Sequence, residues 1–436
     1  MKLLTNKKLA TAVRYALTVG AMVATGAVFA QDATPAGQAE PATAKTLQTV
    51  VVTGSRIRSA DIETAQPIIV MDRTEIEHQG FNSVADILQN LPEAGTPPIS
   101  RSSVLASGES VGGYYIDMRN LGANRTLILL NGKRLGTTTD GLQDLSQIPV
   151  SAIDRIEVLK DGASSIYGSD AIAGVVNIIL KENYTGAEAS AYYGQNEHGD
   201  GESEAYSFTM GSTGDKSSIV FGANYTKDGE ISANNRSSTR YTFGEDHILE
   251  GLSGFSPWGS YHTVDADGNR TGPDMYLNHT GSYDGKGVGA DSRDPNNYHT
   301  PRATDGSDHY NPSQDRDLAP RNELKSIFTN VRYDFNDYVS FRANGMYSER
   351  DTHRQIAGYP NRSTTQANNP VYISPDSYYN PEPGETLYFT RRTTELPRTT
   401  DTNVKSYHFD AALEGAFTLG EYDWNWDIGT NYNKYD

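Results

Sequence analysis

Polar and apolar residues alternate along the second half of this 436-residue chain, after Lys181. Apolar or aromatic side chains occupy every second position, and polar side chains lie between them. This period of two predicts β-strands with one apolar face. The pattern occurs in seven segments, at residues 187–193, 206–210, 219–225, 327–335, 339–347, 407–413 and 422–428.

The connections between these segments are either very short or very long. The short turns are residues 211–216, 336–337 and 419–421, and the long polar connections are residues 227–323 and 351–403. Short turns on one side and long loops on the other are typical of outer-membrane β-barrels. We expect one more hairpin near Arg240 to Phe243, so seven strands is a minimum.

A soluble β-sandwich is the alternative, because its strands also alternate polar and apolar positions. A sandwich needs its apolar faces to form a shared core. It would not explain the Trp and Tyr residues clustered at strand ends or the alternation of connection lengths. The pattern therefore favours membrane strands.

Residues 62–181 predict a compact α/β domain. The segment 82–93 places four apolar residues on one helical face and is ended by Pro92. These are Val84, Ile87, Leu88 and Leu91. Asp72 or Thr74 can start an earlier helix.

Strands are predicted in the same domain at residues 67–71, 125–130, 155–159 and 171–181. The pair Asn131-Gly132 predicts a tight hairpin turn, because both residues tolerate the positive φ angles that such turns require.

The N-terminal part of the chain has three sections. Residues 1–30 combine a basic start, a short apolar run and a small-residue end, which predicts a secretory signal peptide. Residues 31–45 predict a flexible linker. Val50 to Val52 then favour an extended backbone. This extended segment is either an ordinary buried strand or an exposed strand that adds to the sheet of another protein.

Three longer segments carry a family resemblance. They are VADILQNLPE, MRNLGANRTLILLNGKRL from Met118 to Leu135, and IDRIEVLKDGASSIYGSDAIAGVVNIILK from Ile153 to Lys181. In order and spacing they resemble the plug domain of TonB-dependent outer-membrane receptors, with departures at Asn120 and Asp161. TVVVTG, N-terminal to them, looks like a TonB box.

The resemblance implies an α+β plug domain followed by antiparallel transmembrane β-barrel strands. It implies a localisation in the outer membrane of a Gram-negative bacterium and contact with TonB and its inner-membrane energising complex. The TonB-box-like residues are Thr49, Val50, Val51, Val52 and Thr53. The expected sections are 1–30 signal peptide, 31–45 linker, 46–57 TonB-box-like segment, 58–181 plug and 182–436 the N-terminal part of the barrel. Since this family's barrels have about twenty-two strands, and only large barrels hold a plug, we expect the sequence to be a fragment with an incomplete barrel.

Several plug residues are expected to shape or gate the plug. They are Arg119, Gly122, Arg125, Asn131, Gly132, Arg155, Glu157, Gly162, Tyr167, Gly168, Gly174 and Asn177. The glycines permit positive φ or close backbone approach. Our hypothesis for Arg119, Arg125, Arg155 and Glu157 is an ionic cluster between plug and barrel wall, and the alternative is that water solvates them.

Composition limits the partners. Lys plus Arg is 37 and Asp plus Glu is 55, giving a net charge of −18, which argues against nucleic acid. The chain has no cysteine, and no segment after the signal is apolar and long enough to span a bilayer as a helix. Barrel strands contact lipid through their apolar face, so outer-membrane lipid is a further expected partner.

Enzyme and metal motifs are weak. GESVG at residues 108–112 matches the hydrolase pattern with Ser110 as nucleophile, but it lacks the strand before and the helix after that the pattern needs. The loop histidines lack metal-site spacing and are interpreted as solvated. They are His247, His262, His279, His299 and His309. DADGN, from Asp265, could bind calcium only weakly.

The expected function is TonB-energised uptake of a scarce substrate, an iron–siderophore or another small organic ligand. We expect no enzyme activity, cofactor or metal site, and no substrate-binding residue can be assigned. The alternatives are a passive adhesin or structural barrel and, less favoured, a secreted serine hydrolase.

Overall fold

The computed structural model describes residues 68–79, 83–95, 111–301, 306–364, 370–420 and 422–436. These residues belong to one unit of the chain. The predicted signal peptide, the linker and the TonB-box-like segment lie outside the described residues.

The first part of the described chain is an α/β domain with a five-stranded sheet. Only the β2–β5 pair is parallel. In spatial order the strands are β1 (Ile68–Asp72), β4 (Ile153–Leu159), β5 (Gly174–Leu180), β2 (Thr126–Leu130) and β3 (Lys133–Arg134). The predicted strands are therefore confirmed.

Short helices pack around this sheet. The α-helices are α2 (Arg73–Gln79), α3 (Val84–Gln89) and α4 (Ser164–Tyr167), and the 3-10 helices are η2 (Ala123–Arg125), η3 (Leu145–Gln147), η4 (Val150–Ala152) and η5 (Ser169–Ala171). Asp72 starts α2, because its Oδ1 accepts a hydrogen bond from the N–H of Glu75 over 2.9 Å. Val84, Ile87 and Leu88 of α3 are buried in the domain core, as their spacing predicted.

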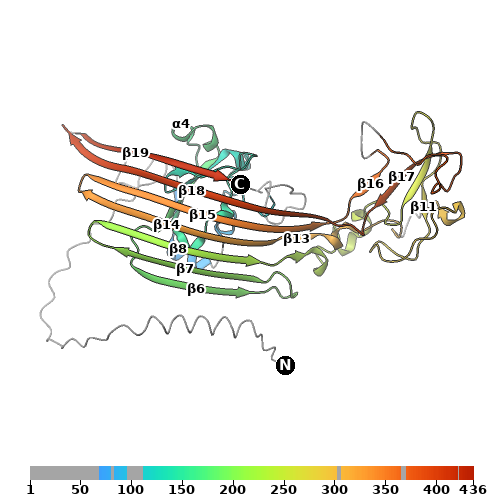
Figure 1. Ribbon diagram of the computed structural model, residues 1–436, viewed down its shortest axis with the longest axis horizontal. Coiled ribbons are helices and arrows are strands. Elements are labelled where there is room, and N and C mark those ends of the chain that lie inside the picture. The colour runs from blue at the N-terminus through green and yellow to red at the C-terminus, as the bar shows by residue number, and fades with distance from the viewer. Residues whose placement is uncertain (1–67, 80–82, 96–110, 302–305, 365–369, 421) are drawn as a thin grey trace, which may run out of the picture. The chain divides into compact units, whose positions relative to one another are not determined.

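A seven-stranded antiparallel sheet follows, and all seven predicted strands are present in it. Successive strands lie side by side along the sheet (Figure 1). They are β6 (Gly186–Gly194), β7 (Ser203–Thr213), β8 (Ser217–Asp228), β14 (Arg321–Asn336), β15 (Val339–Ile356), β18 (Arg398–Leu419) and β19 (Tyr422–Tyr435). The short turns lie between β7 and β8, β14 and β15, and β18 and β19, as predicted.

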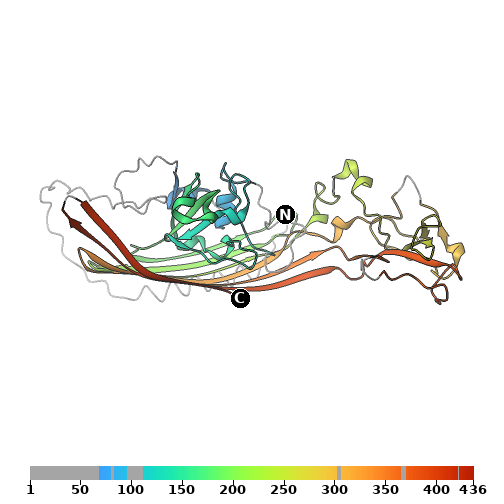
Figure 2. The same cartoon turned by 90° about the horizontal axis from the view of Figure 1, so that it is seen from above.

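The two faces of this sheet differ in polarity. The α/β domain lies against one of them, the inner face (Figure 2), through contacts such as that of Gln147 with Ser348. The inner face carries many polar, buried residues beside a few apolar ones, Val220, Phe328 and Met346. The polar residues include Asn322, Asn330, Asn344, Ser348, Arg350, Thr352, His408 and Asp410.

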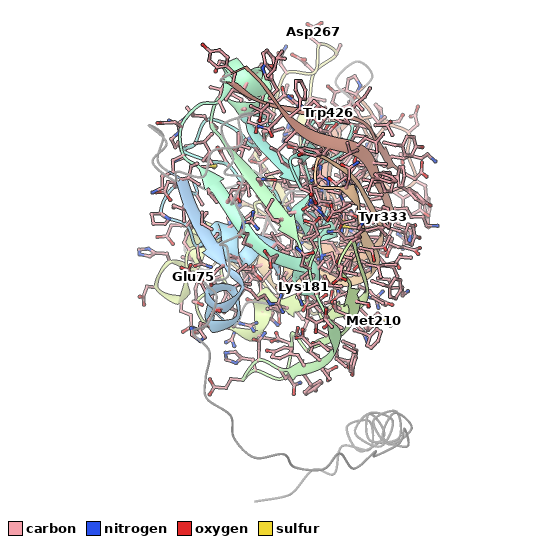
Figure 3. The ribbon with its side chains drawn as sticks, turned by 90° about the vertical axis from the view of Figure 1, so that its left-hand side faces the viewer. Glu75, Lys181, Met210, Asp267, Tyr333 and Trp426 are labelled. Atoms are coloured by element: carbon pink, nitrogen blue, oxygen red, sulfur yellow. The ribbon has the colours of Figure 1, made fainter. Side chains whose placement is uncertain are left out.

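The outer face is apolar and exposed. Met210 and Tyr333 are 48% and 43% exposed, and both point away from the α/β domain (Figure 3). A soluble sandwich would bury this face and expose the polar one. The sandwich alternative is therefore wrong, and the arrangement matches strands with lipid on one side.

The long connections contain further short strands. A second five-stranded sheet has the order β12 (Tyr298–His299), β11 (Met275–Leu277), β10 (Ser260–Val264), β17 (Thr386–Arg392) and β16 (Pro360–Arg362). A separate pair joins β9 (Ile231–Ser232) to β13 (Asp317–Ala319). The loop 3-10 helices are η6 (Ala233–Asn235), η7 (Glu245–His247), η8 (Leu249–Gly251), η9 (Pro295–Asn297) and η10 (Pro312–Asp315).

The hairpin expected near Arg240 to Phe243 is wrong. These residues form turns, in which the N–H of Arg240 donates to the carbonyl of Arg236 over 2.8 Å. The strands of the first long connection lie on either side of this stretch instead.

No helix in the described part of the chain is long and apolar enough to cross a membrane.

Candidate functional site

An ion pair joins the α/β domain to the inner face of the large sheet. Arg350 of β15 donates from Nη2 to Oδ2 of Asp144 over 3.0 Å, and these side chains are 1% and 0% exposed. The other carboxylate oxygen of Asp144 accepts from the backbone N–H groups of Tyr114 and Ser146. The carboxylate is therefore held in place from within its own domain. Loss of either charge would leave the other buried and unpaired.

The backbone at Gly112 lies directly on the sheet. Arg350 donates from Nη1 to the carbonyl of Val111 over 2.6 Å, and Asn322 donates to the carbonyl of Gly112 over 3.3 Å. Gly112 has a φ of +75°, and an added Cβ would lie 2.4 Å from both Asn322 Oδ1 and Thr352 Oγ1. Only glycine fits this conformation at this distance.

The predicted hairpin turn also reaches the sheet. Asn131 and Gly132 both have positive φ angles, 48° and 78°, as a two-residue hairpin turn requires. The Asn131 amide donates from Nδ2 to Oδ1 of Asn344 over 2.9 Å, while its Oδ1 accepts from the N–H of Leu180 over 2.8 Å. One side chain thus fixes the turn and binds the sheet.

Hydrogen bonds continue from Asn344 across the sheet. Asn344 donates to both oxygens of Asp410, at 3.1 and 3.0 Å. His408 lies 3.2 Å from Asp410 and 2.7 Å from Asn433, and Asn433 donates to the carbonyl of Arg134 in the α/β domain. These hydrogen bonds run from the Asn131-Gly132 turn across the sheet and back to Arg134, in the strand that follows the turn.

We use the name seam for one set of these contacts between the domain and the sheet. It consists of Val111, Gly112, Asn131, Asp144 and Gln147 on the domain and Asn322, Asn344, Ser348 and Arg350 on the sheet. Hydrogen bonds dominate it, and each contributes on the order of 1 kcal/mol net, because water can replace the partner.

The family of the α/β domain follows from a sequence comparison. Residues 60–175 match the family model described as the TonB-dependent Receptor Plug Domain. This part of the chain is therefore a plug domain of the TonB-dependent receptor type. The resemblance expected from the sequence is confirmed, and the α/β domain is hereafter the plug.

The solved structures that this chain matches include receptors from three bacteria. A ferric enterobactin receptor (PfeA) mutant from Pseudomonas aeruginosa has a TM-score of 0.43 at 14% identity, with 85% of this chain and 49% of that chain covered. The siderophore receptor PirA from Acinetobacter baumannii gives 0.41 at 16% identity, covering 84% and 48%. The ferric-catecholate import receptor Fiu from E. coli K12 gives 0.39 at 16% identity, covering 85% and 49%. The chain spans about half the length of these proteins.

The structure brings several predicted plug residues together behind the seam. Arg155 donates from Nε to Oε1 of Glu157 over 2.9 Å, and the Glu157 side chain is fully buried. Asn177 donates to the other oxygen of Glu157 over 3.4 Å, and its Oδ1 accepts from the N–H of Gly132 over 2.9 Å. The charges therefore support the Asn131-Gly132 turn from inside the plug.

The ionic cluster expected between plug and wall is not formed by the predicted arginines. Arg119 donates to the carbonyls of Ile172 and Ala173, and Arg125 donates to the carbonyl of Leu121. Arg155 pairs within the plug, with Asp154 as well as Glu157. That part of the hypothesis is wrong, because these side chains bind within the plug. Ion pairs at the wall use other residues, such as the buried pair of Asp144 with Arg350 and the more exposed pair of Lys133 with Asp427 of β19, 2.9 Å apart.

The remaining predicted residues shape the plug itself. Gly174 has a φ of +146°, and an added Cβ would lie 2.7 Å from the Leu159 carbonyl. Gly122 and Gly168 also have positive φ angles, 106° and 86°. An added Cβ at Gly162 would lie 3.1 Å from the Ile172 carbonyl. Tyr167 ends α4 and packs on a small buried apolar cluster.

Asn120, where the sequence departs from the family, has a φ of 55°. Asn adopts this left-handed conformation more readily than most residues do. The substitution therefore fits the turn.

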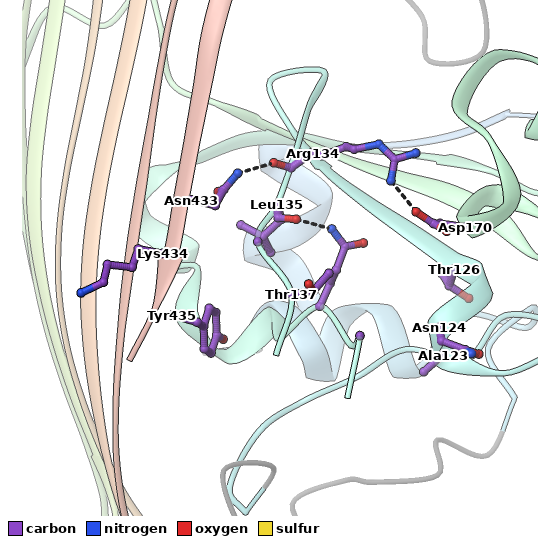
Figure 4. A pocket seen from close by; sticks show the side chains of 13 residues that line it. Ala123, Asn124, Thr126, Arg134, Leu135, Thr137, Asp170, Asn433, Lys434 and Tyr435 are labelled. Atoms are coloured by element: carbon purple, nitrogen blue, oxygen red, sulfur yellow. Dashed lines mark hydrogen bonds and ion pairs between the residues drawn. The ribbon is translucent and has the colours of Figure 1, made fainter. Parts of the chain in front are cut away.

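A pocket of about 540 Å³ lies between the plug and β19 (Figure 4). Arg134 reaches across it to Asp170, with an Nη1 to Oδ2 distance of 2.5 Å, and this guanidinium lowers the pKa of Asp170. Asn433 and Tyr435 of β19 form the opposite side. The lining mixes polar and apolar surface, and its charged residues are Arg134, Lys434 and Asp170.

Two of the loop histidines contact the same carboxylate and are less exposed than expected. His279 and His299 both direct Nε2 at Oδ1 of Asp308, at 3.1 and 2.9 Å, and the His279 side chain is fully buried. His279 also stacks on Trp258, with ring centres 3.6 Å apart. The solvated interpretation is wrong for these two residues, which tie the loop strands together.

A bidentate ion pair closes another loop. Arg236 donates to both oxygens of Asp200, at 2.7 and 2.9 Å. The Arg236 guanidinium holds the pKa of Asp200 well below its usual range. This pair links the β6–β7 connection to the start of the first long loop.

The rival motifs have little structural support. Ser110 lies outside the described residues, and residues 111–117 after it contain no helix, so the hydrolase elbow lacks its second element. The Asp265 carboxylate accepts from the N–H groups of Asp267 and Asn269, which forms a local turn. In the described ranges no group of three or more His, Asp or Glu residues could hold a metal ion.

Proposed function

We propose that this protein is an outer-membrane receptor that imports a scarce substrate with energy delivered by TonB. The substrate is an iron chelate, such as a ferric siderophore, or another small organic ligand. It binds from the side of the long loops. The TonB-box-like segment then pairs with TonB, and a pull on the plug opens a path along the inner face of the sheet.

One observation carries this proposal. A TonB-dependent receptor plug is held on the polar face of a sheet whose other face is apolar and exposed. The apolar face suits contact with outer-membrane lipid, and the polar face suits a path for a hydrated substrate. A passive adhesin has no use for a plug held by a separable seam.

The position of the seam contacts supports movement of the plug as one body. Asp144 and Gln147 lie close together near η3 and contact one strand, β15, at Arg350 and Ser348. Force applied to the plug would load these contacts together. In the proposed mechanism the protein binds, orients and releases its substrate and catalyses no reaction.

The N-terminal roles are part of the proposal. Residues 1–30 would direct export, residues 31–45 would give reach into the periplasm, and Thr49 to Thr53 would add as a strand to TonB. Such pairing uses main-chain hydrogen bonds, which explains why β-branched residues suit the segment. Gram-negative outer-membrane localisation follows from the same proposal.

Deletion of Thr49 to Thr53 from the full-length receptor tests the proposal. Uptake of the substrate into cells should fall to the level of a strain without TonB, while binding to whole cells is unchanged. Deletion of five residues from the linker, 36–40, serves as the control and should leave both intact. Uptake that survives loss of the segment would contradict TonB-energised import.

A further inference from the structure

Three arginines lie on the inner face of β15, and only two of them have an acidic partner. Arg342 pairs with Glu414 over 3.1 Å, and Arg350 pairs with Asp144 over 3.0 Å. Arg354 is the third, four residues beyond Arg350 on the same face, about 13 Å along the strand. Its side chain is among the largest fully buried ones, and the residue is 2% exposed.

The Arg354 guanidinium has no hydrogen-bond partner in the described part of the chain. This holds for all three of its nitrogens, Nε, Nη1 and Nη2. An arginine cannot lose its charge to adapt, so it remains a buried cation with five unsatisfied N–H groups. Native proteins rarely leave such a group without a partner.

No neighbouring charged group makes a hydrogen bond to the Arg354 guanidinium in the described part of the chain. Asp317 in β13 accepts from the N–H of Gln355 over 2.6 Å and makes no hydrogen bond to Arg354. Burial raises the pKa of the Asp317 carboxyl above its usual value. Arg316, next to Asp317, adds a second buried nitrogen, Nε, without a partner. Asp317 lies near enough to attract Arg354 electrostatically, but it leaves the guanidinium N–H groups without an acceptor.

We propose that Arg354 is the centre of a binding site for an oxyanion, the carboxylate or phosphate group of the molecule that the receptor imports. The planar guanidinium presents two parallel N–H donors that match two oxygens of such a group. Arg354 lies two residues before β15 ends at Ile356, where the second long loop begins. This inference rests on the proposed function, in which the substrate enters from the side of the long loops.

Binding to the purified full-length receptor in detergent tests the site without TonB or uptake. The probes are inorganic phosphate and citrate, with chloride at equal ionic strength as the reference. Thermal unfolding of the wild-type receptor should shift upward with phosphate or citrate and not with chloride, because ligands that bind the folded state stabilise it.

Arg354→Gln should abolish this shift. Without any oxyanion, the variant should also unfold at a higher temperature than the wild type, because it removes a buried, unpaired charge. Arg354→Lys should keep a weakened response. Arg321→Gln is the matched control, since Arg321 is exposed on β14 and pairs in register with His353, the neighbour of Arg354. It should behave as the wild type.

Three results would overturn the site. They are an unchanged oxyanion response in Arg354→Gln, a wild-type receptor that responds equally to chloride, or a lower unfolding temperature of Arg354→Gln without oxyanion. The last would mean that another part of the protein already pairs with Arg354. Import that persists after deletion of Thr49 to Thr53 would contradict the proposed function and leave this binding result standing.

Discussion

Asp144 of the plug and Arg350 of the sheet form an ion pair that water does not reach, although 206 residues separate them in the chain. The pair has a fixed geometry because backbone N–H groups hold one carboxylate oxygen while the guanidinium binds the other. Breaking this ion pair costs more free energy than breaking any other contact of the seam, because both buried charges must then become hydrated.

Arg350→Ala should weaken plug docking strongly. It leaves the Asp144 carboxylate buried and unpaired, which costs roughly 3–5 kcal/mol. The plug should unfold at lower urea concentration in the purified full-length receptor, and cells should become sensitive to a large antibiotic that the outer membrane normally excludes. Adding Asp144→Asn should recover part of the loss, because the charge disappears while an acceptor oxygen remains. A double variant worse than Arg350→Ala would contradict this account.

Gly112→Ala should damage the seam more than Gly141→Ala. The two glycines have nearly the same φ, 75° and 74°, so the backbone strain is shared, at about 1 kcal/mol. An added Cβ at Gly112 would meet Asn322 and Thr352, whereas nothing lies within 4 Å of one at Gly141. The excess loss of stability, about 1–3 kcal/mol from overpacking, should appear in urea unfolding of the plug. Equal effects at both positions would show that the close approach is unimportant.

Arg155→Ala should lower plug stability with little effect on antibiotic exclusion. Its partners, Asp154 and Glu157, lie in the plug, so the loss weakens the support of the Asn131-Gly132 turn and spares the wall contacts. The comparison is with Arg350→Ala in the same antibiotic assay. Exclusion lost equally in both variants would restore the idea that Arg155 holds the plug to the wall.

The loop closed by Asp200 and Arg236 should open only in acid. The pKa of Asp200 is lowered in the folded protein, so its stabilising effect is complete above the unfolded value of about 3.9. The effect is lost as the pH falls from there toward the folded pKa. Hydrogen exchange of the Gly199 and Gly201 amides, corrected for intrinsic rates, should be constant from about pH 7 to 4 and faster below. Asp200→Asn should show fast exchange throughout, and a wild-type transition near pH 6 would contradict the assignment.

The strands of the large sheet could be predicted from sequence because a period of two is a local property. Tyr407, Phe409 and Leu413 were expected on one face, and all three are exposed on the outer face. The turn at Asn131-Gly132 could be predicted for the same reason, since its chemistry lies in two adjacent residues.

The seam could not be predicted, because its partners are far apart in the chain. Nothing near Asp144 distinguishes it from the other acidic residues until Arg350 lies opposite. Arg119 and Arg125 were expected at the wall because they lie in family-like segments. A sequence motif does not determine the direction of a side chain. The contact of His279 with Asp308 could not be predicted either, because it depends on the fold of a loop that has no sequence signature.

The central claim, that the seam must open for import, is tested most directly by locking it. The chain has no cysteine, so Gln147→Cys with Ser348→Cys would add a single pair where the two side chains now touch at 2.7 Å. Uptake by the oxidised full-length receptor should stop while substrate binding persists, and a reductant should restore uptake. Each single variant should import normally. Undiminished uptake by a fully cross-linked receptor would contradict the account.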